Sequence, residues 1–141
     1  MISYKENMVD AKTFIMLRDN EPFMSYKESD VKVALQNSLF TILALDGSKP
    51  IGMARVIGDG RIAFFIKDVV VKKEYRRQKI GTEIMNRVLD YIKSVCCDNA
   101  YVGLMATPHK EPFYEQLGFT VRPNKDHGAG MLMFIKKGET K

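Results

Sequence analysis

Five cationic side chains gather within one short stretch in the middle of the chain: Lys72, Lys73, Arg76, Arg77 and Lys79. The stretch follows the apolar run 69–71 and leads, through Gly81, into a segment whose apolar residues recur at helical spacing. Backbone N–H groups at a helix start have no partners within the helix, and the helix dipole places partial positive charge there. A strand, a basic loop and a helix in this order therefore predict a site for an anion such as a pyrophosphate, which can accept several of these N–H groups at once.

The basic loop differs from two other phosphate-binding sequences. It lacks the Gly-Lys-Ser/Thr end of the P-loop, and it lacks the first two spaced glycines of the dinucleotide-binding fingerprint. Taken alone, the loop also fits a generic helix start on a basic surface, because short motifs have real false-positive rates. The net charge of +5 leaves a similar choice open, between attraction of anionic ligands and plain solubility.

The elements around the loop predict an α/β fold with a mixed sheet (an α+β arrangement). Apolar runs bounded by turn residues predict strands at 3–5, 40–45, 51–57, 62–71, 101–105, 119–121 and 131–135. Helical spacing predicts helices at 9–18, after Ser29 and Asp30, at 81–94 and at 112–117, with a break at Glu21-Pro22-Phe23. We expect the three strands between 40 and 71 to form an antiparallel meander. The strand at 62–71, the helix at 81–94 and the strand at 101–105 follow one another, and this order predicts a right-handed parallel crossover.

The composition is that of a soluble globular protein with one domain, residues 1–141. Hydrophobic residues make up 45% of the chain and charged residues 28%, and the length suffices for a single core. No apolar run approaches the roughly 20 residues of a membrane span, and the N-terminus lacks the pattern of a secretory signal. The two cysteines, Cys96 and Cys97, are adjacent, which disfavours both a disulfide and a zinc site. We therefore expect a cytoplasmic protein that holds no metal.

Two stretches of the sequence carry a resemblance to a known family. The first, from Asp68 to Gly81, reads Asp-Val-Val-Val-Lys-Lys-Glu-Tyr-Arg-Arg-Gln-Lys-Ile-Gly, and the second, 113–119, reads Phe-Tyr-Glu-Gln-Leu-Gly-Phe. The first resembles the coenzyme-binding motif of the GNAT superfamily of acyl-CoA N-acyltransferases, in which Gln or Arg is followed by two residues, Gly, any residue, and Gly or Ala. The second is similar to the family's later Phe-Tyr-Glu-Lys-Leu-Gly-Phe stretch. The resemblance covers nearly the whole chain from Phe40 onward, whereas the first 39 residues match only in their number of helices.

One position departs from the family pattern. Lys79 occupies the place where most members carry the middle glycine of the coenzyme-binding motif. A lysine is strained there if the position needs a positive φ. We expect ordinary helix-entry geometry instead, in which Lys79 adds a cation near the phosphates.

The resemblance implies a mostly antiparallel sheet with one splayed parallel strand pair, flanked by helices. It also implies transfer of an acetyl group from acetyl-CoA, as co-substrate and without a metal, to the primary amine of a small molecule by direct attack. The backbone N–H of Val69 would then help to polarise the thioester carbonyl. Lys110 stands where several members place an asparagine that touches the coenzyme. The residues implied in coenzyme binding are Val69, Val70, Val71, Arg76, Arg77, Gln78, Lys79, Ile80, Gly81, Thr82 and Lys110.

Two residues are candidates for the proton transfers. Tyr114 matches the family tyrosine near the thioester sulfur, and a phenol with its ordinary pKa of about 10 is protonated at neutral pH and can donate to the leaving thiolate. Asp68 either accepts the amine proton, directly or through water, or only satisfies local polar groups. A water chain is a further option for the base. His109 has a suitable ordinary pKa, but a loop histidine is more often simply solvated.

The acceptor and the alternatives stay open at this stage. Arg55, Arg61 and Arg122 suit an anionic acceptor, whereas Asp59 and Asp68 suit a cationic one. The alternatives to a small-molecule enzyme are a non-catalytic CoA-binding regulatory module and an acetyltransferase that acts on a protein or peptide amine. We expect a small-molecule amine as partner, neither nucleic acid nor a membrane, and leave a homodimer open.

Overall fold

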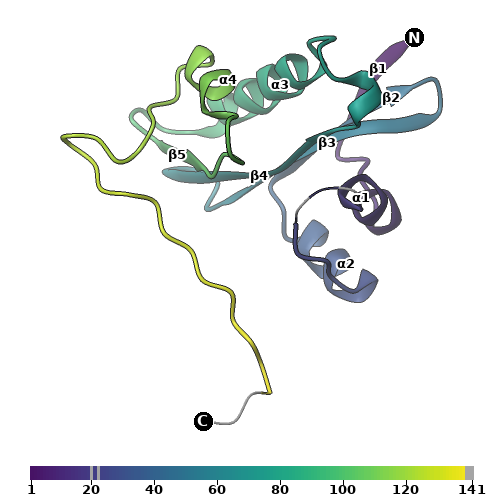
Figure 1. Cartoon of the computed structure of the whole chain (residues 1–141), viewed down its shortest axis with the longest axis horizontal. Coiled ribbons are helices and arrows are strands. Elements are labelled where there is room, and N and C mark those ends of the chain that lie inside the picture. The colour runs from purple at the N-terminus through teal and green to yellow at the C-terminus, as the bar shows by residue number, and fades with distance from the viewer. Residues whose placement is uncertain (20, 22, 139–141) are drawn as a thin grey trace. The chain divides into compact units, whose positions relative to one another are not determined.

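The computed structural model describes residues 1–19, 21 and 23–138 of the chain (Figure 1). The chain divides into two compact units, Met1–Leu104 and Met105–Lys141. One domain over residues 1–141 stays a prediction. The break expected at Pro22 falls on a residue outside the described part of the chain.

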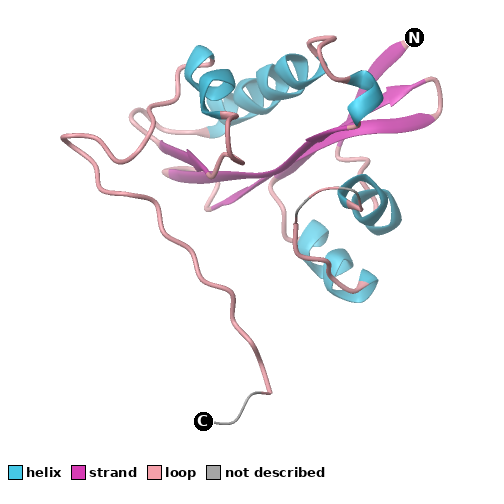
Figure 2. Ribbon diagram, viewed as in Figure 1, coloured by secondary structure: helices cyan, strands magenta, loops and turns pink. Residues whose placement is uncertain are grey.

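The first unit is built on a five-stranded sheet (Figure 1 and Figure 2). Its strands are β1 (Ile2–Glu6), β2 (Phe40–Asp46), β3 (Lys49–Gly58), β4 (Ala63–Val71) and β5 (Tyr101–Leu104). They lie side by side in chain order, with β1 to β4 antiparallel and β5 parallel to β4. The predicted mixed sheet with a single parallel pair is therefore confirmed.

Short turns join the antiparallel strands. Between β2 and β3 the chain turns at Gly47, whose φ of 60° lies in the left-handed region that glycine adopts without strain. Between β3 and β4 the carboxylate of Asp59 accepts the backbone N–H groups of Arg61, Ile62 and Ala63 at 2.8–3.1 Å. Asp59 thus holds this turn together, as an aspartate at the start of a turn commonly does.

Helices cover both faces of the sheet (Figure 1). Helix α3 (Ile80–Val95) lies on one face, and α1 (Ala11–Arg18) and α2 (Glu28–Gln36) lie on the other. Helix α1 begins where the side chain of Asp10 accepts the N–H of Thr13 at 2.8 Å, which satisfies one donor of the first turn. The helices predicted from apolar spacing are all found, with shifts of one or two residues at most of their ends.

Alternation along the strands supplies an apolar layer to each face. Toward α1 and α2, one buried cluster contains Ala11, Phe14, Leu17, Val31, Leu43, Met53 and Val70. Toward α3, the fully buried Ile84 lies close to Gly52, where an added Cβ would approach its Cδ1 to 3.1 Å. Phe40 of β2 stacks on Tyr91 of α3 with ring centroids 4.5 Å apart. The sheet is therefore buried on both faces, which explains the unbroken apolar run at the end of β4.

The second unit contains one short helix, α4 (Glu111–Gln116), as its regular element among the described residues. The strands predicted at 119–121 and 131–135 are wrong, since both segments are irregular. The side chains of residues 131–135 are 56–88% exposed. Their composition suits a strand, but a strand is stable only when it is paired, and the described part of this unit contains no strand to pair with.

Candidate functional site

The pairing of the two parallel strands stops partway along β4, where β5 ends. Pairing between β4 and β5 runs from Ala63 and Tyr101 to Ile66 and Leu104, whereas β4 itself continues to Val71. From Lys67 onward β4 pairs only with β3 among the described strands. Its other edge therefore carries backbone groups that an extended ligand with amide groups could pair with, in the manner of an added strand. The resemblance implies a splayed pair at this place, and in this structure the pairing stops because β5 ends at Leu104.

A bulge interrupts β4 where this open edge begins. Lys67 pairs with Arg55 and Val70 with Met53, so Asp68 and Val69 together face a single residue of β3. Asp68 has a φ of 59° in the left-handed region, as the first residue of one type of β-bulge does. The bulge breaks the regular ladder beside Val69, the residue whose N–H would, by the family resemblance, polarise the thioester carbonyl.

The segment after β4 is a compact basic loop. A short 3-10 helix, η1 (Lys73–Tyr75), is followed by residues 76–79 and then by α3. Arg77 and Lys79 both have positive φ, of 69° and 61°, and Lys79 precedes the first residue of α3. The expectation of ordinary helix-entry geometry at Lys79 is therefore wrong. The position needs the left-handed conformation that a glycine adopts without strain, and a lysine adopts it here at a cost.

Arg76 is engaged within the protein rather than left open. Its Nε donates to the carbonyl oxygen of Val71 at 2.9 Å, and its guanidinium forms an ion pair with Glu21 at 2.9 Å. The side chains of Arg77, Gln78 and Lys79 are exposed. The loop thus offers exposed cations at 77 and 79, while Arg76 joins the end of β4 to the segment that follows α1.

The start of α3 is available to an anion through its backbone. Among the residues that the structure describes, no side chain caps this helix start. Ile80 is buried in the core, so only its main chain can face a ligand, and Gly81 and Thr82 are half-buried. The strand, the basic loop and an uncapped helix start therefore stand in the order that an anion site requires.

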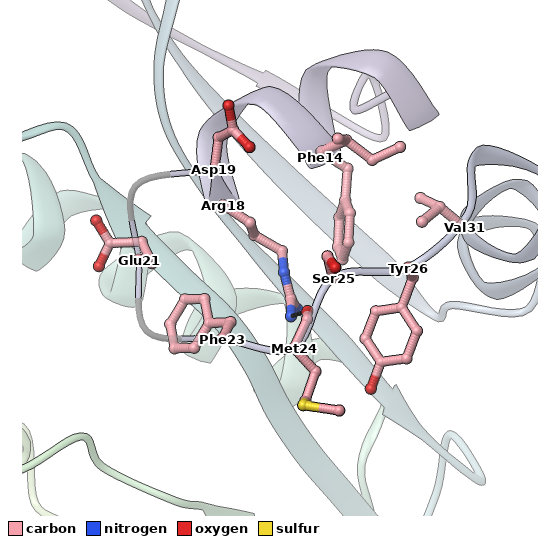
Figure 3. Close-up of a pocket in the computed structure, with 10 residues that line it drawn as sticks. Phe14, Arg18, Asp19, Glu21, Phe23, Met24, Ser25, Tyr26 and Val31 are labelled. Carbon is pink, nitrogen blue, oxygen red and sulfur yellow. Dashed lines mark hydrogen bonds between the residues drawn. The ribbon is translucent and has the colours of Figure 1, made fainter. Parts of the chain in front are cut away.

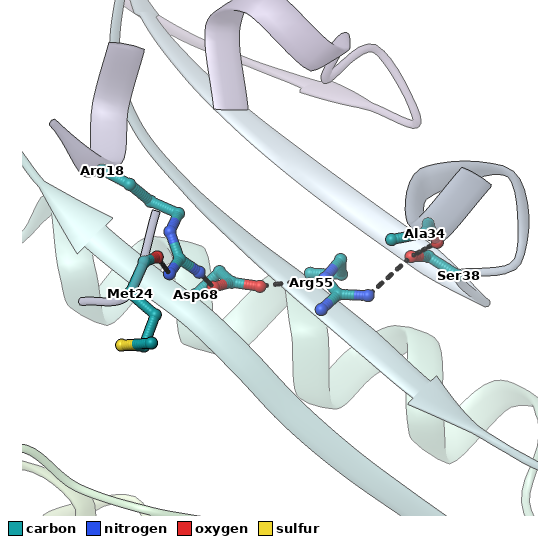
Figure 4. Close-up of polar contacts among 6 residues, drawn as sticks. All are labelled: Arg18, Met24, Ala34, Ser38, Arg55 and Asp68. Carbon is teal, nitrogen blue, oxygen red and sulfur yellow. Dashed lines mark hydrogen bonds and ion pairs between the residues drawn. The ribbon is translucent and has the colours of Figure 1, made fainter. Parts of the chain in front are cut away.

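Asp68 lies at the centre of a buried ion cluster (Figure 4). Its carboxylate accepts hydrogen bonds from Arg18, through one oxygen, and from Nε of Arg55 at 2.9 Å, through the other. The side chain of Asp68 is 3% exposed, and those of Arg18 and Arg55 are 12% and 13% exposed. Two guanidinium groups compensate the burial of one carboxylate, which is the arrangement that a buried charge requires. A role for Asp68 as a base stays a prediction.

The sequence reasoning missed Arg18. Its guanidinium lies over the rings of Phe14, Phe23 and Tyr26, with distances of 5.1, 4.9 and 5.5 Å to the ring centroids. It also donates to the carbonyl oxygen of Met24 at 2.6 Å. The signal in the sequence was an arginine at the end of an apolar helix stripe with aromatic residues shortly after it, a pattern typical of a cation held by aromatic rings.

These residues form the wall of a small pocket of about 70 Å³ between α1 and the segment leading to α2 (Figure 3). Aromatic and aliphatic side chains make up most of the lining, and Asp19 and Glu21 add carboxylates at one side. The lining residues are Phe14, Ile15, Arg18, Asp19, Glu21, Phe23, Met24, Ser25, Tyr26 and Val31. Its lining has the mixture of apolar walls and few polar groups that small-molecule sites commonly show, but its volume is well below the roughly 300–1,000 Å³ of such sites.

Tyr114, His109 and Lys110 belong to the second unit, whereas Asp68 and the basic loop belong to the first. Tyr114 lies on α4, and its ring meets those of Phe113 and Phe119 edge to face, with centroids 4.9 and 6.1 Å apart. Burial raises the pKa of Tyr114 above its ordinary value, because it disfavours the charged phenolate. The phenol is therefore protonated throughout the neutral range. His109 and Lys110 are exposed, and Lys110 precedes the first residue of α4.

Within residues 1–19, 21 and 23–138, no group of three or more His, Cys, Asp or Glu side chains is placed to hold a metal ion. In the same part of the chain, no helix has the length and apolar character needed to cross a membrane.

Comparison with known proteins gives consistent matches. A family model described as an acetyltransferase (GNAT) domain matches residues 4–135. GCN5-related N-acetyltransferase 1 of Arabidopsis thaliana is 30% identical over 115 residues, covering 79% of this chain and 55% of that protein. Serotonin N-acetyltransferase 2 of Oryza sativa subsp. japonica is 28% identical over 110 residues, covering 75% of this chain and 54% of that protein. Both are described as chloroplastic. The chain thus spans about half the length of these curated relatives.

Solved structures agree with the family match. A probable acetyltransferase of unknown function from meticillin-resistant Staphylococcus aureus has a TM-score of 0.85 and 31% identity, covering 95% of this chain and all of that one. A GNAT family acetyltransferase from Streptococcus pneumoniae has a TM-score of 0.78 and 28% identity, covering 97% and 99% of the two chains. The fold and these matches define a GNAT acetyltransferase domain. The chain belongs to the GNAT acetyltransferase family.

Proposed function

We propose that the protein transfers the acetyl group of acetyl-CoA to the primary amine of a small molecule. The observation that carries this proposal is the open edge of β4, which leads directly into a basic loop and an uncapped helix start. Acetyl-CoA has an extended arm with two amide groups and a diphosphate, and these match a free strand edge and an anion site in that order. Val69 and Val71 supply backbone groups for the arm, and residues 77–82 supply charge and N–H groups for the diphosphate.

The reaction needs three contributions from the protein. A neutral amine attacks the thioester carbonyl carbon, forming the C–N bond, and the N–H of Val69 stabilises the oxyanion that develops. The C–S bond then breaks, and the phenol of Tyr114 donates its proton to the departing thiolate. The ammonium proton leaves through water, and Tyr114 regains its proton from solvent. The raised pKa of Tyr114 supports its part, because an acid must hold its proton at working pH.

Three of the five charged groups named from the sequence are engaged within the protein and give little support to an anionic or a polyamine acceptor. Asp68 and Arg55 are paired with each other, and Asp59 accepts three backbone N–H groups. The pocket beside α1 instead has aromatic walls and includes the carboxylates of Asp19 and Glu21, of which that of Glu21 is paired with Arg76. The apolar lining supports an amine with an apolar or aromatic body, of which a pocket of about 70 Å³ holds only a small part. The name of the rice relative, a serotonin N-acetyltransferase, points the same way.

The first test is binding of the coenzyme, measured as protection from thermal unfolding. We expect millimolar CoA to raise the melting temperature, because a ligand that binds only the native state stabilises it. Arg77→Gln removes an exposed loop cation and should reduce this protection. Lys93→Gln removes an exposed cation from the last turn of the same helix and should not. An unchanged melting temperature of the wild type would refute the proposal.

The second test is release of free thiol from acetyl-CoA with a panel of amines. Arylalkylamines should give the fastest release, ahead of polyamines, amino-sugar phosphates and peptides with a free N-terminus. CoA binding without thiol release for any amine would identify a non-catalytic CoA-binding module instead. Release with peptides alone would identify an enzyme that acts on protein or peptide amines.

A further inference from the structure

The bulge of β4 combines an unfavourable backbone with a buried charge. Asp68 holds a left-handed φ of 59° within a strand, a conformation that costs about 1–2 kcal/mol for most residues, less for aspartate and asparagine, and nothing for glycine. The bulge begins two residues beyond Ile66, the last β4 residue paired with β5, and so lies at the start of the open edge. A glycine would adopt this backbone without strain. The aspartate must therefore contribute through its carboxylate.

That carboxylate links four parts of the first unit (Figure 4). One oxygen binds Arg18, the last residue of α1, and the other binds Arg55 of β3. Arg55 in turn donates to Oγ of Ser38 at 3.3 Å, and Ser38 donates to the carbonyl oxygen of Ala34 in α2 at 2.8 Å. A continuous chain of polar contacts thus runs from the bulge to the ends of both helices on that face.

Arg18 extends the same chain to the pocket. Its guanidinium binds the carbonyl oxygen of Met24 and lies over the rings of Phe23 and Tyr26, all of which line the pocket. The segment between α1 and α2 is therefore fastened to the bulge through one arginine. A shift of that segment must move Arg18, and a shift of Arg18 must disturb the pair with Asp68.

We propose that Asp68 is a positioning residue that fixes the bulge of β4 and, through Arg18, holds the pocket segment in register with it. The inference rests on the proposed function, in which the N–H of Val69 binds the developing oxyanion and the pocket receives the amine. Asp68 then aligns the two reactants without touching either. Displacement by about 1 Å can lower a rate roughly 100-fold, so rigid alignment at the bulge has a large effect on turnover.

The test compares two variants of Asp68 that alter its side chain in different ways. Asp68→Asn keeps the shape and tolerance of the left-handed backbone but leaves two guanidinium groups without a negative partner. Asp68→Gly removes the strain and the side chain together. We expect each to lower kcat by about 10- to 100-fold with less than about a threefold change in the Kd for CoA. Asp90→Asn, on the exposed side of α3, is the matched control and should leave kcat unchanged.

A second pair of variants separates positioning from proton transfer and from simple loss of stability. Arg18→Lys keeps the charge but loses the planar fork, so it should lower kcat in the same way as Asp68→Asn. The double variant should be no slower than the worse single one, because both break the same contact. The pH profile of kcat should keep its shape in every variant. Loss of an ionisation in Asp68→Asn would assign Asp68 as the base and overturn the inference.

Hydrogen exchange of the backbone gives a readout that does not require turnover. Exchange over residues 66–71 should be faster in Asp68→Asn and Arg18→Lys than in the wild type, and unchanged in Asp90→Asn. Unchanged exchange together with wild-type kcat would overturn the inference. If the wild type releases no thiol with any amine, the proposed function fails, and exchange alone still decides whether Asp68 fixes the bulge.

Discussion

Lys79 provides a direct test of how the coenzyme loop balances backbone strain against charge. It precedes α3 with φ 61° and ψ 19°, and its side chain is exposed. The test replaces it by glycine and, separately, by alanine. Both variants lose the same cation, so any difference between them reports the backbone alone. Glycine relieves about 1–2 kcal/mol of left-handed strain, but it loses about 0.4–1 kcal/mol through the greater freedom of its unfolded chain.

These two effects leave Lys79→Gly more stable than Lys79→Ala by about 0.5–1 kcal/mol. For a chain of this length the difference corresponds to about 2–3 °C in melting temperature. Urea unfolding of the two variants, at the same salt concentration and without coenzyme, measures it. Equal stability of the glycine and alanine variants would show that the position does not need the left-handed backbone.

The same two variants report the value of the lysine charge. Each should bind CoA about 2- to 5-fold more weakly than the wild type at low salt, since an exposed ion pair contributes about 0.5–1 kcal/mol. The three proteins should converge at high salt, because exposed charges are screened. Calorimetric titration at two salt concentrations checks this. Tighter binding by the glycine variant than by the wild type would mean that strain, and not charge, limits affinity.

Three further predictions follow from single contacts. Glu21→Gln should tighten CoA binding in calorimetric titration, because Glu21 holds the guanidinium of Arg76 at 2.9 Å and adds negative charge near the loop. Asp19→Asn in the same segment is the control and should change CoA binding less. Weaker CoA binding by Glu21→Gln would contradict this prediction. Tyr114→Phe should lower kcat with little change in the Kd for CoA, and wild-type turnover would remove the acid role. Asp10→Ala should lower the unfolding free energy by about 1 kcal/mol at pH 7. The hydrogen bond that Asp10 accepts from the N–H of Thr13 at 2.8 Å lowers the pKa of Asp10 in the folded protein. The stabilisation is therefore fully present at pH values above the ordinary pKa of an aspartate, and it is lost as the pH falls through the lowered pKa. Urea unfolding at pH 7 and in acid checks it, and a difference that persists in acid would assign the effect to something other than the carboxylate.

The sequence predicts well those parts of the fold that depend on local periodicity. The meander of β2, β3 and β4, the crossover through α3 and the basic loop all follow from apolar spacing and turn residues, and the structure contains them. The segments 119–121 and 131–135 satisfy the same local rule and still form no strand. Pairing is a property of two segments, and composition describes only one.

The ion cluster around Asp68 lies beyond any local pattern. Asp68 and Arg18 are 50 residues apart, and Asp68 and Arg55 are 13 apart. Their meeting depends on the order of strands and on which face carries α1. The conformation of Lys79 was missed for a different reason: the family pattern carried the information, since a glycine at that place indicates a positive φ. A lysine in its place does not change what the backbone requires.

Backbone strain is concentrated at the two ends of the proposed coenzyme path. Six described residues other than glycine have positive φ, and three of them are Asp68, Arg77 and Lys79, within twelve residues of the chain. Each of the three carries a charge, although glycine would remove the strain and asparagine would tolerate it better. Selection for stability alone would favour those replacements. Charged residues at these positions are therefore consistent with a need for the charges themselves, one within the buried cluster proposed to fix the bulge and two in the exposed loop proposed to bind the diphosphate.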